Sequence, residues 1–210
     1  MRKFIFVMML AIVSLLTSCE GKKNEEQQNF NDETKVESLV VDNTISTDRE
    51  FMFLNYGGDY RWFETCILMK NFMDEDTDGS VEAVTSIFQV VTELESDCYD
   101  THVIMTVHTL DTSTIEVKEG FWVEDYPLNN EAVCISFEEA FTKLMEANCP
   151  KPHSKHCVLR KEVGPVSANP QYIFGNNRCQ VYVDATTGDV STINPVFPDA
   201  NLNGPLGEWP

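Results

Sequence analysis

The sequence lacks the motifs by which common hydrolases and nucleotide-binding enzymes are identified. It contains no Gly-x-Ser-x-Gly, no His-Glu-x-x-His and no Walker-type phosphate loop. Its 4 histidines and 7 cysteines occur without the flanking motif of a cysteine hydrolase. The sequence therefore predicts that the protein is not an enzyme.

Basic residues are scarce. The chain has 15 Lys and Arg residues against 34 Asp and Glu, which gives a formal net charge of −19 at neutral pH. A body this acidic repels phosphate backbones and anionic membrane surfaces. The charge therefore excludes nucleic acid as an expected partner.

Long apolar runs are also scarce. The run from Phe4 to Leu16 is too short to span a bilayer. It follows a basic start at Arg2 and Lys3 and leads into Leu15-Leu16-Thr17-Ser18-Cys19, which fits a lipobox. This order predicts a lipoprotein signal peptide over 1–18 and lipidation of Cys19. An ordinary secretory peptide with an incidental cysteine and a buried N-terminal strand are the alternatives.

Residues 19–49 predict an acidic, disordered tether, because their polar composition leaves little to bury against the entropy of ordering. The basic and then acidic residues after Cys19 form either a plain linker or an export tag like that of surface lipoproteins of Gram-negative bacteria. Acyl chains contribute about 0.8 kcal/mol per buried CH₂, so a multiply acylated Cys19 would hold the protein on a membrane. We expect a lipid anchor in the cell envelope, at the outer membrane, with the membrane face left open.

Residues 50–130 predict an antiparallel β-meander. Strand-like runs cover 60–69, 103–108 and 115–118, and residues 121–123 extend the last of them. Residues 80–94 match a helical face but are rich in β-branched types. A strand is favoured there because a hairpin-like Asp-Thr-Asp-Gly turn precedes it.

Residues 131–195 predict one helix followed by three strands. Ser136 suits the N-cap position, and Phe137, Phe141 and Leu144 form one apolar stripe with Met145. Strands are expected at 157–160, 171–174 and 179–184, the last two joined by a Gly-Asn-Asn turn. The fold class is therefore α+β, with a meander followed by a helix-plus-strands unit and an irregular tail at 196–210.

This second unit resembles the PepSY domain family. The resemblance rests on Ile-Ser-Phe-Glu-Glu-Ala at 135–140 and on the Tyr-x-Asp and Thr-Gly-x-Val elements within Val-Tyr-Val-Asp-Ala-Thr-Thr-Gly-Asp-Val at 181–190. It implies a small α+β module of an exported protein, without catalytic residues. A peptidase-inhibiting role has been proposed for the family, so the resemblance implies a peptidase or a peptide as partner.

An acidic stretch at 74–82 resembles the start of an EF-hand calcium loop. Asp74, Asp76 and Asp78 occupy positions one, three and five, with Glu82 close behind. Position twelve would be Thr85 rather than the bidentate Glu. A metal-free acidic turn explains the same residues, and both interpretations stay open.

A second cluster combines Cys149, His153, His156 and Cys157. Thiols and imidazoles within nine residues are ligand types for zinc or copper. In an exported protein the two cysteines could instead form a disulfide, or remain simple thiols.

Aromatic residues form a third set, which could line a ligand groove or pack in the core: Trp62, Phe63, Phe121, Trp122 and Tyr126.

These features together predict a non-enzymatic, lipid-anchored envelope protein that binds or regulates a protein or peptide partner. Pairing of a sheet edge with an extended segment is one physical way to do so. The alternative is a structural or metal-binding surface lipoprotein, with calcium at residues 74–82 or zinc at the Cys–His cluster. No cofactor is expected otherwise.

Overall fold

The computed structural model describes residues 38–74, 76–95 and 98–199, which form an α+β fold. In chain order the elements are α1 (Val41–Tyr56), β1 (Tyr60–Met69), β2 (Val81–Glu95), β3 (Cys98–Thr109), β4 (Ser113–Glu119), β5 (Asp125–Tyr126), the 3-10 helix η1 (Asn130–Ala132), α2 (Phe137–Glu146), β6 (His156–Glu162), β7 (Gln171–Asn176), β8 (Cys179–Asp184) and β9 (Val190–Ser191). The predicted signal peptide, Cys19 and most of the predicted tether lie outside the described residues.

All described strands belong to one antiparallel, nine-stranded sheet. Its order is β4-β3-β2-β1-β6-β7-β8-β9, and β5 pairs with the end of β6. The order repeats one plan twice: a helix followed by a meander that grows outward from the middle of the sheet. We call α1 with β1–β4 the first half-unit and α2 with β6–β9 the second half-unit. Pairing of β1 with β6 joins them.

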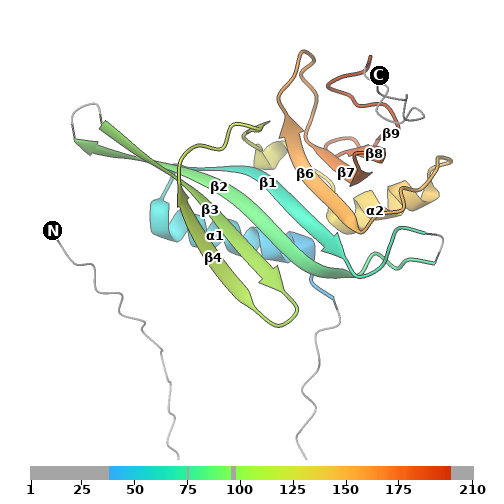
Figure 1. Cartoon of the computed structure of the whole chain (residues 1–210), viewed down its shortest axis with the longest axis horizontal. Coiled ribbons are helices and arrows are strands. Elements are labelled where there is room, and N and C mark those ends of the chain that lie inside the picture. Colours follow the sequence, from blue (N-terminus) through green and yellow to red (C-terminus); the bar gives the residue numbers. More distant parts are fainter. Residues whose placement is uncertain (1–37, 75, 96–97, 200–210) are drawn as a thin grey trace, which may run out of the picture. The chain divides into compact units, whose positions relative to one another are not determined.

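Both helices lie on the same face of the sheet, behind it in Figure 1. Alternate strand residues point to this helix-covered face, as the two-residue period of a strand requires. They form one hydrophobic core with Val41, Ile45 and Met52 of α1 and with Phe137 and Leu144 of α2. The other side of the sheet is called the open face below.

The structure confirms the predicted helix of the second half-unit. The Oγ of Ser136 accepts a hydrogen bond from the Glu139 N–H, which caps the N-terminus of α2. Its buried residues Phe137, Ala140, Phe141 and Leu144 recur at helical spacing. The hairpin between β7 and β8 is also confirmed, although its turn is formed by Asn177 and Arg178, and Gly175 and Asn176 belong to β7. A short further strand, β9, adds to the three that were predicted.

The prediction for residues 41–56 is wrong. The tether was expected to reach residue 49 and the meander to begin at 50, whereas α1 spans both. Val40 provides no side-chain cap, so the local start signal for a helix is missing. Contacts distant in sequence hold α1 instead. Its Asp48 lies 2.7 Å from His108 of β3, and its Asp42 accepts a hydrogen bond from the Phe137 N–H at the start of α2.

Residues 80–94 adopt the favoured strand conformation, as most of β2. The predicted extension at 121–123 is wrong, because β4 ends at Glu119. Gly120 follows with φ 129°, a value that favours glycine, and turns the chain away from the sheet edge. The connection from there to β5 crosses the open face.

The tail has irregular structure up to residue 199, as predicted, but it is packed. Asn194 and Val196 are buried. A Cβ atom at Gly164 would lie 2.1 Å from Val196, so this close approach requires glycine.

Candidate interaction surface on the open face

Cross-strand pairing aligns side chains in rows across the open face. The longest row crosses eight strands: Thr114, Val107, Thr85, Cys66, Val158, Ile173, Tyr182 and Ser191. A parallel row contains Glu116, Met105, Ile87, Glu64, Arg160, Gln171 and Asp184. The first row is mostly apolar and the second is largely polar.

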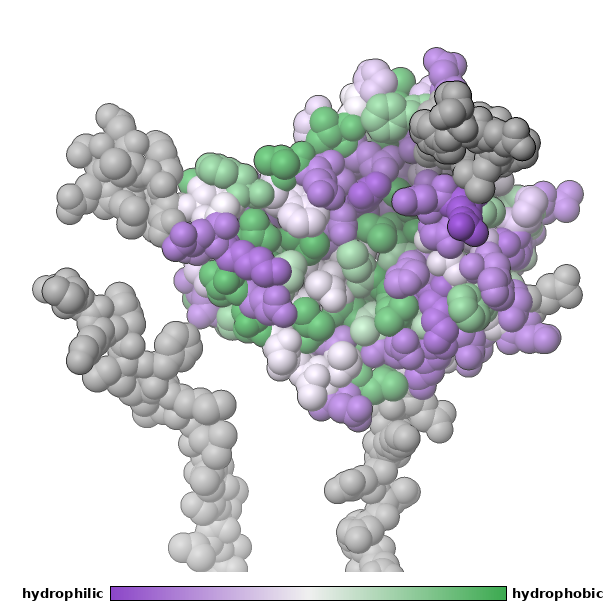
Figure 2. All heavy atoms as spheres, viewed as in Figure 1, coloured by the Kyte–Doolittle hydropathy of each residue, from purple (hydrophilic) through white to green (hydrophobic). Residues whose placement is uncertain are grey.

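The side chains at the two ends of these rows differ in how far they are exposed to solvent. Ile173 and Tyr182 of the second half-unit are buried, whereas Met105, Val107 and Val158 are only half-buried. No helix among the described residues covers this face. Figure 2 looks onto it and shows apolar residues in green interspersed among purple ones in its middle. A half-buried apolar strip therefore crosses the open face over β1–β3 and β6.

Beside this strip lies a buried charge cluster where β1, β5 and β6 meet. Arg160 faces three carboxylates: Glu64 at 3.8 Å, Asp125 at 3.7 Å and Glu162, with which it makes a hydrogen bond. The longer two distances exceed hydrogen-bond length. Asp125 Oδ1 and Arg160 Nε are buried with no hydrogen-bond partner in the described structure. With every group ionised, three negative charges face one positive charge.

Protonation of Asp125 would relieve part of this excess. Burial raises the pKa of Asp125 to about 7, and the negative charge of Glu64 adds to the effect, while the Trp122 hydrogen bond and Arg160 oppose it. The Cys66 thiol donates to Glu64 Oε1 at 2.9 Å. Burial and Glu64 raise the pKa of this thiol far above its ordinary value, so Cys66 is not a reactive thiolate.

The connection between β4 and β5 is fixed over the sheet by Trp122. Its backbone N–H donates to Gln89 Oε1, and its indole N–H donates to Asp125 Oδ2 at 3.2 Å. Phe121 and Val123, on either side of Trp122, are 70% and 78% exposed. Exposed residues of this size and polarity are typical of contact surfaces when they gather in one place.

The aromatic residues that could line a groove or pack in the core are divided by the fold. Trp62 and Phe63 are buried, whereas Phe121 and Tyr126 are exposed. Five of the fourteen large hydrophobic residues that are exposed in the described chain fall between 115 and 126: Ile115, Val117, Phe121, Val123 and Tyr126. The segment from β4 to β5 is therefore the richest in exposed apolar side chains.

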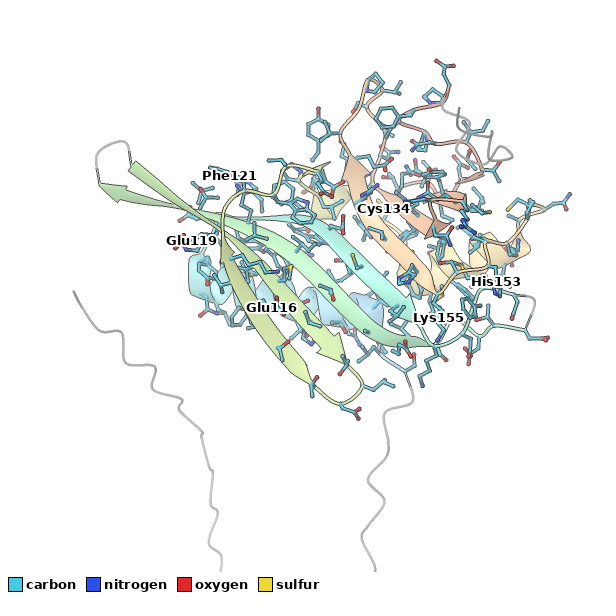
Figure 3. The ribbon with its side chains drawn as sticks, viewed as in Figure 1. Glu116, Glu119, Phe121, Cys134, His153 and Lys155 are labelled. Carbon is cyan, nitrogen blue, oxygen red and sulfur yellow. The ribbon has the colours of Figure 1, made fainter. Side chains whose placement is uncertain are left out.

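β4 forms one edge of the sheet. No strand among the described residues pairs with its outer side, and all seven of its residues are exposed. Figure 3 shows Glu116 and Glu119 along this strand and Phe121 beyond its end. The uncovered strip thus ends at an unpaired strand edge.

The predicted calcium residues lie in a turn that uses its own carboxylates. Asp74 Oδ1 accepts from the Asp76 N–H, and Asp78 Oδ1 accepts from the Ser80 N–H at 2.9 Å. Hydrogen bonds from Ser80 lower the pKa of Asp78. Glu82 lies on β2. These contacts match the acidic-turn interpretation.

The predicted Cys–His cluster is dispersed. Cys157 is buried on the helix-covered face, while His156 is paired with Leu68 on the open face. Cys149 and Cys157 are both free thiols, so no disulfide joins them. His153 stacks on Phe72 with ring centroids 4.3 Å apart.

Cys149 and His153 do line one hollow of about 670 Å³, together with Met73 and Met145. Across residues 38–74, 76–95 and 98–199, however, no three His, Cys, Asp or Glu side chains are arranged to hold a metal ion. The same residues include no helix long and apolar enough to cross a membrane.

The charge cluster had no recognisable motif in the sequence. Glu64, Asp125 and Arg160 come from three distant segments, each an ordinary charged residue in its local context. The one detectable signal is the position of Glu64, which interrupts an otherwise mostly apolar strand run. Comparisons of the chain with protein-family models, curated proteins and solved structures find no match.

Proposed function

We propose that the protein is a non-enzymatic, lipid-anchored envelope protein that receives a protein or peptide partner on its open face. The observation that carries the proposal is the one-sided cover of the sheet. Both helices pack on one face, and the other keeps a half-buried apolar strip beside exposed Phe121 and Val123. Apolar surface of this kind is stabilised when a partner removes it from water.

The chemistry in the middle of the surface favours binding over catalysis. The Arg160 cluster has its charged groups packed against one another, and Cys66 has a raised pKa. Neither arrangement supplies an accessible nucleophile beside a free base. The PepSY resemblance of residues 131–195 adds a peptidase, or a peptide, as the expected class of partner.

The binding face can be tested by crosslinking in living cells. A photo-crosslinking phenylalanine analogue at Met105 of the full chain should form a discrete adduct with one partner. Val107→Glu in the same chain should weaken that adduct about fivefold or more, because it places a charge where apolar contact is expected. Val107 lies on the open face and is only half-buried, so the substitution leaves the helix-covered core unchanged.

The control places the same analogue at Val163, which is 43% exposed but lies in the β6–β7 connection. It should give no such adduct. Identical adduct patterns from positions 105 and 163 would overturn the proposed face.

The anchor has a separate test. Mass spectrometry of the N-terminal peptide should find acyl chains on Cys19, and Cys19→Ser should release the protein from the membrane fraction. An unmodified Cys19 in a membrane-free protein would overturn the anchor and leave the binding face untouched.

A further inference from the structure

The hydrogen-bonding direction of every β4 residue follows from two bonds. The Gly120 N–H donates to Thr101 O, and the Thr109 N–H donates to Thr112 O. In an antiparallel pair, bonded residues alternate with unbonded ones. Thr114, Glu116 and Lys118 therefore bond to β3, and the odd-numbered residues of β4 direct their N–H and C=O groups outward.

The outward groups belong to Ser113, Ile115, Val117 and Glu119, a row of alternating donors and acceptors along the edge. Ile115 and Val117 are 49% and 56% exposed. An edge of this length and composition accepts a further strand, and natural proteins usually protect such an edge. β4 carries two charged side chains on the open face, Glu116 and Lys118. They have opposite signs, and their charged atoms lie 3.5 Å apart.

These two charges make the strand complementary to itself. When two β4 strands run antiparallel with Val117 opposite Val117, Glu116 of each copy lies opposite Lys118 of the other. The outward residues then form the bonded pairs, and the charged residues occupy the unbonded positions, where side chains approach most closely. A shift of two residues in either direction would place Glu116 opposite Glu116, or Lys118 opposite Lys118.

We propose that β4 pairs with β4 of a second copy of this chain, in the register that sets Val117 opposite Val117. The pairing joins the sheets of the two copies into one continuous sheet, and it places both open faces on the same side of that sheet. A partner that contacts both faces gains from the linked arrangement, because its second contact is intramolecular. The inference does not depend on the lipid anchor or on the proposed partner.

Cysteine crosslinking tests the register. Val117→Cys in the full chain should form a disulfide-linked dimer under mild oxidation, since bonded antiparallel residues have Cα atoms about 5.5 Å apart, within disulfide range. Ile115→Cys is the matched control, because position 115 lies opposite Glu119 of the other copy and should stay unlinked. The wild-type chain, with its exposed Cys134, sets the background.

Charge exchange tests the pairing independently. Glu116→Lys and Lys118→Glu should each weaken dimer formation roughly tenfold, because each creates two like-charge pairs. Mixing the two variants should restore a mixed dimer close to wild-type affinity, measured by copurification of two differently tagged chains. Glu146→Lys, on the exposed end of α2, repeats the charge change away from the edge and should have no effect.

Val117→Pro removes an outward N–H without touching the bonds to β3, so it should abolish the dimer while the fold remains. Circular dichroism of this variant checks the fold. A chain that stays monomeric at every concentration would overturn the proposal. So would a disulfide adduct between the Val117→Cys variant and a different protein, which would identify the edge as a site for another extended segment.

Discussion

The two half-units share one plan but acquire their helices differently. α2 has a side-chain cap at Ser136 and a continuous apolar stripe, so its own sequence specifies it. α1 has no capping side chain at its exposed N-cap residue Val40, and its buried stripe of Val41, Ile45 and Met52 is interrupted by Asp48. Its position depends on Asp42 and Asp48, which contact α2 and β3. Equivalent elements can thus be specified locally in one half and by tertiary contacts in the other.

The sheet shows a second difference. The first four residues of β7 are buried in succession, as are three consecutive residues of β8. In the first half-unit, β4 is exposed throughout, and Met105 and Val107 on the open side of β3 are half-buried. The second half-unit therefore uses both faces for stability, while the first keeps one face available.

The largest expected effect lies in the second half-unit. Phe174→Ala should lower the free energy of unfolding by about 3–5 kcal/mol, because a fully buried ring is lost. Its centroid lies 6.1 Å from Phe137 and 6.3 Å from Phe141, so the change also loosens α2. Urea denaturation followed by circular dichroism measures the loss.

Met105→Ala is the counterpart on the open face and should cost no more than about 1.5 kcal/mol, because Met105 is only half-buried. Equal losses for the two variants would contradict the contrast between the half-units.

An intermediate effect is expected where the half-units join. Asp125 has a pKa of about 7 in the folded chain against an ordinary value of 3.8. Between about pH 4 and pH 7 the folded state therefore retains a proton that the unfolded state has released. Stability falls as pH rises through this window, by up to about 1.4 kcal/mol per pH unit.

Asp125→Asn removes this titration. The variant should gain on the order of 2 kcal/mol relative to wild type between pH 5 and pH 8, measured by urea denaturation at each pH. Glu124→Gln, at the exposed neighbouring position, should leave the slope unchanged. A wild-type slope that persists in the Asp125→Asn variant would show that another group titrates.

The smallest effects compare the helix caps. Ser136→Ala should destabilise the protein by about 1 kcal/mol, because the Glu139 N–H loses its acceptor. Val40→Ser should stabilise it by roughly 0.5–1 kcal/mol, because Val40 is exposed and already has extended backbone angles suited to a cap. Thermal unfolding measures the stability change of each variant. A loss of stability in Val40→Ser as well as in Ser136→Ala would contradict the explanation that α1 lacks a cap.

Local signals predicted much of the fold. Runs of β-branched and aromatic residues predicted β1, β6, β7 and β8, and the Ser136 cap with the apolar stripe predicted α2. β2 was ambiguous because its β-branched residues also match a helical face, and its pairing with β1 and β3 decides the matter. No local signal predicted that the two halves form one sheet, because this depends on the pairing of β1 with β6, a strand distant in the sequence.

The candidate surface was harder to predict. Clustering of ligand types within nine residues suggested a site at Cys149–Cys157, but successive residues of β6 point to opposite faces and separate His156 from Cys157. The Arg160 cluster has the reverse property, because its members become neighbours only through strand pairing. Proximity along the chain was therefore a poor guide to both.

The pairing of β1 with β6 imposes an order on assembly. Hairpins β1–β2, β2–β3 and β3–β4 connect segments that are close in the chain, whereas β1 and β6 are roughly ninety residues apart. A chain that emerges from its N-terminus can complete the early hairpins while the later segment is still being synthesised. Until that segment is synthesised, β1 has one side without a strand partner and can aggregate through it. A delay at this stage would therefore leave time for a chaperone to bind the nascent protein.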